Sequence, residues 1–521
     1  MRSTQRANLT GVPGVLQKAD ELYKAGEYEA ILRLLRNARL DRRDERVLSA
    51  IYQARAALTL DRPKEVAPIL QRASKEVNGA EETVLVRMLL GSALTRTEQR
   101  EEGEAMLEDA AALAQRSAPQ HVGEVGYYRA LSRWSSDRVD EAEAIVEAAL
   151  PHAADYARSR LLQLAGWIDT RRENYASAAR KFTEALAALN ESDIRDVKGR
   201  ARILNALAII AAETIDLRLG RLVRREYEAS TWSNDTRIER YLVLGFLAWL
   251  SLLEGNVVRA WDERQRGLTL TVDTAHHATA LVMARYVATI VGDRFSAERY
   301  LELAGALLLR GDQVDLDVDH RSALLAYAIA APPENVETAR RVLALYDRTS
   351  PRRTEMLALE GDRRLDVYAQ YARGRVLVAE GNVSRGVDEL ERSFDAFMQL
   401  GYRLRAALVA NDLRTVTGEE RYAKAGLDAL RNAPKAWLRD ALQRDAPADP
   451  LGQLTRAQRR VLRELCTGKK AREIAAGFDR SFNTINNHTR AVFSAFGVRS
   501  RASLVAECAR LGILDDVKAL R

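Results

Sequence analysis

Residues 483–490 carry side chains that can hydrogen-bond to the edges of DNA bases. The segment reads NTINNHTR. An asparagine amide can form two hydrogen bonds with adenine, and an arginine guanidinium can form two with guanine. We therefore predict that Asn486, Asn487 and Arg490 contact bases in a major groove. The same polar surface also fits an ordinary solvated helix, so the surrounding pattern has to decide between the two.

An amphipathic helix has to present these side chains. Its inner face is predicted from residues that recur with helical spacing, namely Ile485, Thr489, Val492 and Phe496. The opposite face holds short polar side chains and an arginine, namely Asn483, Asn487, Arg490 and Ser494. Thr484 and Asn486 lie on its flanks. Because this face has no acidic residue, DNA phosphates would not repel it.

Two shorter helices are expected before this one. Thr455 and Gln458 have the spacing of a capping box, which predicts a helix start. Gly468 suits the left-handed residue that ends a helix. A second helix is expected from about Ala471. Ser481 is the expected N-cap of the third helix, which should run to about residue 495.

This segment resembles the LuxR-type helix-turn-helix domain of bacterial transcription regulators over residues 454–514. The matching residues are Leu454-Thr455, Glu473-Ile474-Ala475, Ser481, Thr484-Ile485, His488, Gly497-Val498 and Ser500-Arg501. The resemblance implies that the second helix braces the turn and that the third reads double-stranded DNA. It also implies a fourth helix, Ala502 to Leu511, which often forms a dimer contact. We therefore expect a homodimer on DNA.

Several positions depart from the family pattern. The family usually has a small polar residue and Asn where this chain has Lys470 and Ala471, and an apolar residue at Arg480. It favours Lys at Asn486 and Ala495, and an apolar residue at Thr489. These departures leave the N-cap of the second helix open. The missing lysines indicate an altered sequence preference or a weaker hold on phosphates.

A second set of residues is predicted to contact DNA phosphates. Cations in loops beside a reading helix hold the backbone without reading sequence, and polar side chains at its N-terminus do the same. The predicted phosphate contacts are Lys469, Lys470, Ser481, Thr484, Arg499 and Arg501.

Positive charge is concentrated in this segment. The whole chain has a formal net charge of +7. Residues 454–514 hold 12 Lys and Arg against 4 Asp and Glu, which gives +8. The last seven residues are balanced, so the first 453 carry about −1. A nearly neutral body with one basic module is typical of a targeted DNA binder rather than of a protein that coats nucleic acid.

The rest of the chain reads as helical repeats. The clearest unit, Leu161–Asn190, has the small and large residues of a tetratricopeptide repeat at the expected spacing: Gly166, Tyr175, Ala178, Phe182 and Ala185. Similar turns are found near residues 26, 62, 100, 138, 217, 255, 292, 335, 381 and 418. We predict an all-α chain: a tetratricopeptide-like α-solenoid of ten or eleven helix pairs at 1–431, a proline-bearing linker at 432–453, and a four-helix DNA-binding domain at 454–521.

The two cysteines, Cys466 and Cys508, are predicted to be buried thiols, which fits a reducing cytosol. The most apolar run, Tyr241 to Leu253, is too short to span a bilayer and reads as a buried helix. The first 14 residues lack the apolar core of a signal peptide. These features predict a cytoplasmic protein, associated with the nucleoid when it is bound to DNA.

No catalytic or cofactor site is predicted. The chain contains no G-x-x-x-x-G-K-[ST] phosphate-binding loop. The series Asp315, Asp317 and Asp319 lacks the glycine and the final carboxylate of a calcium loop. His276 and His277 have no partner ligands nearby in the sequence and are expected to be solvated. We therefore predict no catalytic residue, no metal and no cofactor, and a protein that is not an enzyme.

Two functions remain open at this point. One is a sequence-specific transcription regulator whose repeat domain senses a ligand or binds a protein, such as RNA polymerase. The other is an interaction scaffold whose terminal domain no longer reads DNA, supported only by the unusual residues at 470 and 471 and the missing lysines.

Overall fold

The computed structural model describes residues 14–232, 236–270, 273–310, 315–316, 318–351, 362–443, 454–496, 498 and 500–510. Within these residues the chain is helical apart from a two-residue parallel strand pair, β1 (Asp315–Leu316) and β2 (Ser350–Pro351). The all-α prediction is confirmed. The chain divides into two compact units, one containing 1–410 and 426–439 and the other 411–425 and 440–521.

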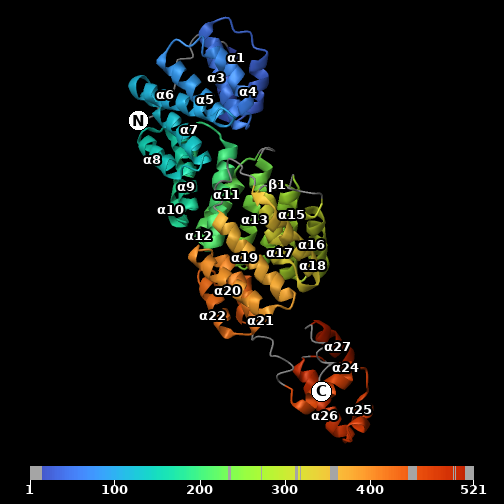
Figure 1. Ribbon diagram of the computed structural model, residues 1–521. Coiled ribbons are helices and arrows are strands. Elements are labelled where there is room, and N and C mark those ends of the chain that lie inside the picture. The colour runs from blue at the N-terminus through green and yellow to red at the C-terminus, as the bar shows by residue number, and fades with distance from the viewer. Residues whose placement is uncertain are drawn as a thin grey trace. The chain divides into compact units, whose positions relative to one another are not determined.

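Helices α1 to α22 follow one another in eleven pairs, most joined by a short turn (Figure 1). Their bounds are α1 Gly14–Ala25, α2 Tyr28–Arg36, α3 Arg43–Thr59, α4 Pro63–Ala73, α5 Ala80–Thr95, α6 Arg100–Ser117, α7 Val122–Ser135, α8 Val139–Ala149, α9 Asp155–Arg171, α10 Tyr175–Glu191, α11 Val197–Thr214, α12 Leu217–Ala229, α13 Arg237–Leu253, α14 Val257–Leu268, α15 Thr274–Val291, α16 Arg294–Leu308, α17 Val318–Ala330, α18 Val336–Arg348, α19 Asp362–Ala379, α20 Val383–Gln399, α21 Arg403–Thr417 and α22 Glu420–Ala429.

Most of the predicted turns coincide with a residue in the left-handed region of backbone space. Glycine fills this position in five of the pairs, at residues 26, 255, 292, 381 and 418. Asp61, Asp137, Glu173 and Ile215 adopt the same conformation without being glycine. Because an L residue meets steric resistance there, tight packing on either side has to hold these turns. The predicted repeat boundaries are confirmed.

Small residues allow the two helices of a pair to approach closely, as the repeat pattern predicted. A Cβ atom added to Gly103 in α6 would lie 2.6 Å from the backbone nitrogen of Thr95 in α5. One added to Gly166 in α9 would lie 2.8 Å from the ring of Phe182 in α10. Trp134 and Trp249 are buried at 2% and 3% exposure. These tryptophans therefore pack between helices and do not line an open surface.

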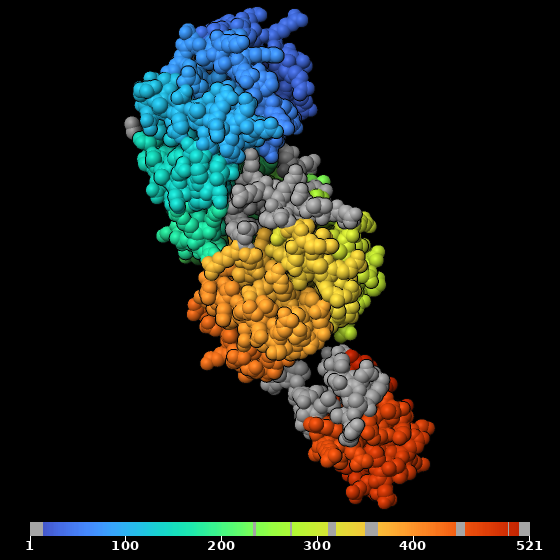
Figure 2. Space-filling model, viewed as in Figure 1, coloured from blue at the N-terminus to red at the C-terminus, as the bar shows by residue number. Residues whose placement is uncertain are grey.

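The repeat helices curve until residues far apart in the sequence meet. We call the unit containing 1–410 and 426–439 the repeat unit. Arg405 in α21 donates to Glu213 in α11 across 192 residues, at 2.6–3.0 Å. Arg363 in α19 donates to Glu173 across 190 residues, at 2.9–3.0 Å. A small rotation at each pair thus accumulates until the superhelix meets itself. In the space-filling view, neighbouring colours adjoin along this unit, as expected where each pair packs on the next (Figure 2).

The predicted linker at 432–453 is only partly described, and the described part includes a helix. Helix α23 spans Trp437–Gln443. The Trp437 ring lies 5.6 Å from that of Trp249 and 6.4 Å from that of Tyr286. An aromatic anchor therefore holds the start of this segment, which composition alone had indicated to be a linker. Residues 444–453, with Pro447 and Pro450, lie outside the described residues, and the predicted domain boundaries stay predictions.

The prediction for the histidine pair was wrong for His276. This ring is buried, its Nδ1 lies 2.6 Å from a carboxylate oxygen of Asp273, and its edge faces the ring of Tyr241. In the part of the chain that the structure describes, no cluster of three His, Cys, Asp or Glu side chains could hold a metal ion. None of the described helices is both long enough and apolar enough to cross a membrane.

The described residues from 454 to 510 contain four helices: α24 Arg456–Cys466, α25 Ala471–Gly477, α26 Phe482–Ala495 and α27 Arg501–Arg510. We call residues 454–510 the terminal domain. Its core holds residues from all four helices: Leu454, Val461, Leu462, Leu465, Ile474, Ala475, Ile485, Val492, Phe496, Leu504 and Cys508. The predicted helix starts and ends are confirmed to within one residue.

Candidate nucleic-acid interface

Side-chain caps fix where the first and third helices of the terminal domain begin. The backbone N–H of Gln458 donates to Oγ1 of Thr455 at 3.3 Å, and that of Thr455 donates to Oε1 of Gln458 at 2.8 Å. The backbone N–H of Thr484 donates to Oγ of Ser481 at 3.1 Å. Since a cap satisfies backbone donors that the helix leaves free, these contacts set the start of each helix.

The second helix is capped by Glu473, which the sequence analysis named as part of the family pattern but did not predict to be a cap. Lysine cannot accept a hydrogen bond, so Lys470 does not replace the usual polar residue. The carboxylate of Glu473 accepts from the backbone N–H of Lys470 at 2.7 Å instead. Asp479 then turns the chain with φ of 47°, and the backbone N–H of Arg480 donates to the carbonyl of Ala475 at 3.1 Å. The unusual residues at 470 and 471 therefore leave the helix-turn-helix intact.

Helix α26 has the two faces that its sequence predicted. Its inner residues are all buried: Ile485, Thr489, Val492 and Phe496. Thr489 hides its hydroxyl by donating to the carbonyl of Ile485 at 2.8 Å. The outer residues are all exposed: Asn483, Asn487, Arg490 and Ser494. Of the flanking residues, Thr484 is exposed and Asn486 is half-buried.

The three predicted base-reading residues thus share an accessible side of α26. Neither Asn486 nor Asn487 engages another side chain of the described chain. For Arg490, no carboxylate among the described residues lies within ion-pairing distance. A guanidinium with no internal partner keeps all its donors for a ligand. The arrangement can therefore hold an anionic, hydrogen-bonding surface against α26.

The cations predicted to contact phosphates differ in whether another group of the protein already binds them. Lys470 is exposed, and among the described residues its ammonium has no carboxylate partner. Lys469 is exposed too, but its ammonium lies 2.6 Å from Glu464, whose pKa is lowered mainly by that hydrogen bond. The guanidinium of Arg501 donates to the carbonyl of Gly468. Arg499 lies outside the described residues.

Ser481 and Thr484 lie together at the N-terminus of α26. Their hydroxyl oxygens are 2.9 Å apart, and both side chains are exposed. The hydroxyl oxygen of Ser481 caps the helix as an acceptor, and one of the two hydroxyls donates to the other, so one O–H remains available to a ligand. Backbone N–H groups at a helix N-terminus also favour an anion. This end of the helix can therefore accept a phosphate.

The structure adds basic residues that the sequence analysis did not single out. Arg456, Arg460 and Arg463 line a hollow on α24. The guanidinium of Arg460 lies 4.6 Å from the centre of the Phe478 ring. In α25, the guanidinium of Arg472 lies 5.8 Å from the ring of Phe482, which is 46% exposed. The aromatic residue at the first position of α26 is visible in the sequence but was not among the predicted site residues.

The two cysteines lie in the core between α24 and α27. Their sulfur atoms are 4.0 Å apart, and both thiols are free. Burial raises the pKa of Cys508 to about 12. This thiol therefore stays protonated at neutral pH, when thiolate is the reactive form. The prediction of a buried thiol is confirmed for Cys508, whereas Cys466 is only half-buried.

The predicted dimer helix turns its larger apolar residues toward the core. Leu504 and Cys508 of α27 are fully buried, and Val505 is half-buried. The exposed side of α27 consists of small residues and one arginine: Arg501, Ala502, Ser503, Ala506 and Ala509. Small residues permit close helix approach but contribute little apolar area, so this side could support only a modest contact.

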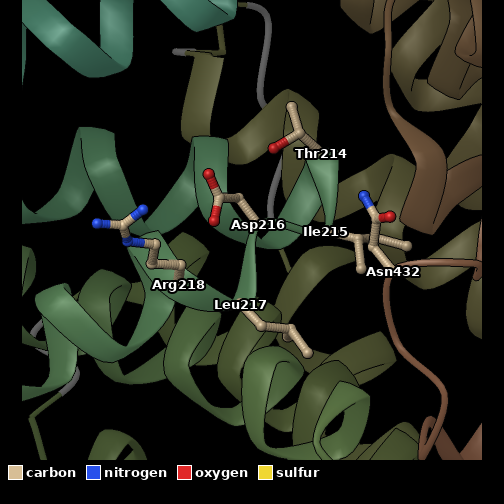
Figure 3. Close-up of a pocket in the computed structure, with 6 residues that line it drawn as sticks. All are labelled: Thr214, Ile215, Asp216, Leu217, Arg218 and Asn432. Atoms are coloured by element: carbon tan, nitrogen blue, oxygen red, sulfur yellow. The ribbon is translucent and has the colours of Figure 1, made fainter.

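The repeat unit has polar groups of its own, and most of them are satisfied internally. Arg224 contacts Glu263 and Glu254 at 3.2 Å each. An open hollow of about 550 Å³ lies at the turn after α11. It is lined by Thr214, Ile215, Asp216, Leu217, Arg218 and Asn432 (Figure 3). The Asp216 carboxylate accepts from the backbone N–H of Leu219 at 2.9 Å, so it caps α12.

Comparison with known proteins identifies the terminal domain. Residues 452–507 match the family model of bacterial regulatory proteins of the luxR family. The end of the chain is therefore a LuxR-type helix-turn-helix domain, as its residues predicted. A search of curated proteins finds no match.

Two solved structures are similar to the chain in fold. One is the crystal structure of Rap protein complexed with Competence and Sporulation Factor, at 14% identity and a TM-score of 0.43, which covers 70% of this chain and 99% of that one. The other is the apo form of RapI, at 10% identity and a TM-score of 0.40, covering 75% and 97%.

Proposed function

We propose that this protein is a sequence-specific DNA-binding transcription regulator of the bacterial cytoplasm. The observation that carries the proposal is the outer side of α26, a helix without acidic residues. Asn487 and Arg490 are exposed there and have no side-chain partner among the residues that the structure describes. A helix-turn-helix consists here of α25 and α26. In such a motif, residues near the N-terminus of the later helix, which is α26, meet base edges in the major groove. Asn486, Asn487 and Arg490 are the proposed base-reading residues.

The backbone of the same DNA would be held by the residues around α26. The proposed phosphate contacts are Lys469, Lys470, Ser481, Thr484, Arg499 and Arg501. Of the described cations in this set, Lys470 is expected to contribute most, because no carboxylate of the described residues pairs with its ammonium. Lys469 contributes less because Glu464 lies 2.6 Å from its ammonium. Since Arg501 already donates to a carbonyl of the domain, its contact with phosphate would use its remaining donors.

The repeat unit is proposed to bind a small ligand or a protein partner, and to act on DNA binding through contact. Stacked helix pairs create extended surfaces of the kind that repeat proteins use for binding. A ligand would change DNA binding only by favouring one arrangement of the chain over another. RNA polymerase is one candidate partner. No residue supports an enzymatic role, so we propose a protein that is not an enzyme.

On DNA the protein is proposed to be a homodimer. A single terminal domain has a small footprint, and domains of this type bind paired half-sites. The measurement is the stoichiometry of the complex with a selected duplex at saturating protein, by analytical ultracentrifugation. Two chains per duplex would support the dimer, and one chain per duplex would contradict it.

The alternative is an interaction scaffold whose terminal domain no longer reads sequence. Selection from a pool of random duplexes with the full chain separates the two functions. A regulator enriches one motif over successive rounds, whereas the scaffold enriches none. The scaffold was supported mainly by the unusual residues at 470 and 471. Because Glu473 caps α25 despite these residues, they no longer favour the scaffold over the regulator.

A further inference from the structure

Phe482 is an exposed aromatic residue at the first position of the proposed reading helix. It is 46% exposed, and among the described residues of the terminal domain it is the one large hydrophobic side chain that is exposed. It belongs neither to the core of that domain nor to the half-buried residues packed against the core. Phe478 and Phe493, by contrast, both pack against that core. The core of the terminal domain therefore does not account for an aromatic residue at position 482.

The position of Phe482 relates it to the proposed base-reading residues. Phe482, Asn486 and Arg490 are spaced at i, i+4 and i+8, so they lie on one ridge of α26. Phe482 is the residue of this ridge nearest the N-terminus, where recognition helices reach furthest toward the bases. The cap between Ser481 and the backbone of Thr484 fixes the start of the helix and makes Phe482 its first residue.

The surroundings of Phe482 also favour a nucleic acid. The guanidinium of Arg472 lies 5.8 Å from the ring centre, and Arg472 is exposed on α25. One side of the ring thus faces a cation, which would favour a nearby phosphate. Ser481 and Thr484 add two exposed hydroxyl groups at the same N-terminus of α26. An exposed aromatic ring next to a cation, at a helix end that carries hydroxyl groups, matches a surface that is anionic at its edge and apolar at one point.

In the major groove, the apolar group that distinguishes the bases is the 5-methyl of thymine, and Phe is one of the side chains that contact it. We infer that the ring of Phe482 packs on the 5-methyl group of a thymine next to the bases read by Asn486 and Arg490. Phe482 is thus a specificity-determining residue. The inference rests on the proposed function, because it requires that α26 enters a major groove.

The test uses the full chain and a duplex selected from a random pool. Each thymine of the selected site is replaced in turn by deoxyuridine, which removes the methyl group and keeps every base hydrogen bond. One replacement should lower the affinity of the wild-type protein by about fourfold, since burial of one CH2 contributes about 0.8 kcal/mol. In Phe482→Ala, the same replacement should have no further effect.

Two variants serve as controls. Phe295 in the repeat unit is 80% exposed at the second position of α16, so Phe295→Ala makes the same chemical change elsewhere. It should retain the full response to deoxyuridine. Phe482→Leu keeps an apolar side chain and should retain part of that response. Because Phe482 lies outside the core, the far-ultraviolet circular dichroism of both Phe482 variants should match that of the wild type.

Three outcomes would overturn the inference. The wild type could tolerate deoxyuridine at every position, or Phe482→Ala could keep the wild-type response. Phe482→Ala could also weaken binding to selected and scrambled duplexes equally, which would assign the ring to the DNA backbone or to folding. Failure of the selection to enrich any motif is a different result. It would remove the proposed function, and this inference would fall with it.

Discussion

The repeat unit and the terminal domain use arginine in opposite ways. In the repeat unit, Arg405 forms a bidentate contact with Glu213, a carboxylate that is 2% exposed. In the terminal domain, Arg490 is exposed on α26 and has no carboxylate within reach among the described residues. One region neutralises its cations to hold helices together. The other leaves Arg490 and Lys470 without a carboxylate partner among its described residues, and an unpaired surface cation is available to an anionic partner.

Because of this difference, the net charge indicates a DNA-binding surface only when it is counted separately for the repeat unit and the terminal domain. The repeat unit is rich in arginine, yet the first 453 residues carry a formal charge of about −1. Its cations are matched across repeats, as in the contact of Arg55 with Glu124 at 2.8 Å. The terminal domain holds few carboxylates. Glu464 pairs with Lys469, and Glu473 caps the N-terminus of α25. DNA should therefore bind the terminal domain and be indifferent to the repeat unit.

The largest effect is expected from breaking the buried pair. Glu213→Gln leaves the guanidinium of Arg405 buried without a charge partner, which should destabilise the repeat unit by about 3–5 kcal/mol. Urea titration of the full chain by circular dichroism measures this loss. The exposed pair Arg299 and Glu302 is the control, because both side chains are at least 60% exposed. Glu302→Gln should cost about 0–1 kcal/mol. Equal losses in the two variants would mean that burial of the pair does not matter.

The second effect concerns acid stability. Burial alone would raise the pKa of Glu124, but Arg55 and His121 outweigh it and lower the pKa to about 2. A carboxyl with a lowered folded pKa contributes stability that is present above its unfolded pKa and is lost as pH falls through the folded value. The unfolding free energy should thus fall by about 2–3 kcal/mol between roughly pH 4.5 and pH 2 because of this group. In Glu124→Gln that part of the pH dependence should disappear, and an unchanged profile would contradict the role of Arg55.

Substitution of Arg490 should reduce the favourable free energy of DNA binding by an amount comparable to the loss of stability expected for Glu124. Arg490→Ala should weaken binding to the selected duplex by about 1–3 kcal/mol at one base position. Arg490→Lys keeps the charge but not the bidentate geometry, so it should lose base discrimination while the salt dependence stays unchanged. Fluorescence anisotropy on matched and mismatched duplexes measures both. If Arg490→Ala weakens binding to all duplexes alike, Arg490 contacts phosphate and does not read a base.

The smallest effect should come from single phosphate contacts. Lys470→Gln should reduce the slope of log K against log salt by about 0.9. Lys469→Gln should reduce it by less, because Glu464 already holds that ammonium. Arg299→Gln in the repeat unit is the control and should leave the slope unchanged. A change from Arg299 as large as that from Lys470 would place DNA on the repeat unit and break the contrast between the regions.

Local patterns predicted local structure well. The capping pairs at Thr455 and Ser481 set the helix starts, and the spacing of Ile485 and Val492 gave the inner face of α26. Turn glycines likewise marked five of the eleven helix pairs. Each of these signals arises within a few residues of chain, so the sequence carries it directly.

Contacts over long distances in the chain were not predictable in the same way. The meeting of Glu213 with Arg405 depends on rotations accumulated over five helix pairs, and no single repeat encodes that sum. The helix at Trp437–Gln443 was missed because prolines in its neighbourhood indicated a linker, while its aromatic partners lie about 150 residues or more away. The ion pair between Lys469 and Glu464 was not predicted, because the sequence does not show which carboxylate a loop lysine approaches in the folded chain.

The most direct test of this account is the ratio of two affinities. The full chain is titrated against the selected duplex and against a scrambled duplex of the same composition, at one salt concentration. A sequence-specific regulator that reads bases through α26 should bind the selected duplex about 10³-fold more tightly or better. Arg490→Ala should reduce that ratio by about five- to 150-fold, which corresponds to about 1–3 kcal/mol, and leave the affinity for the scrambled duplex almost unchanged. A ratio near one for the wild-type protein would contradict the account and leave the terminal domain as a basic surface that does not read sequence.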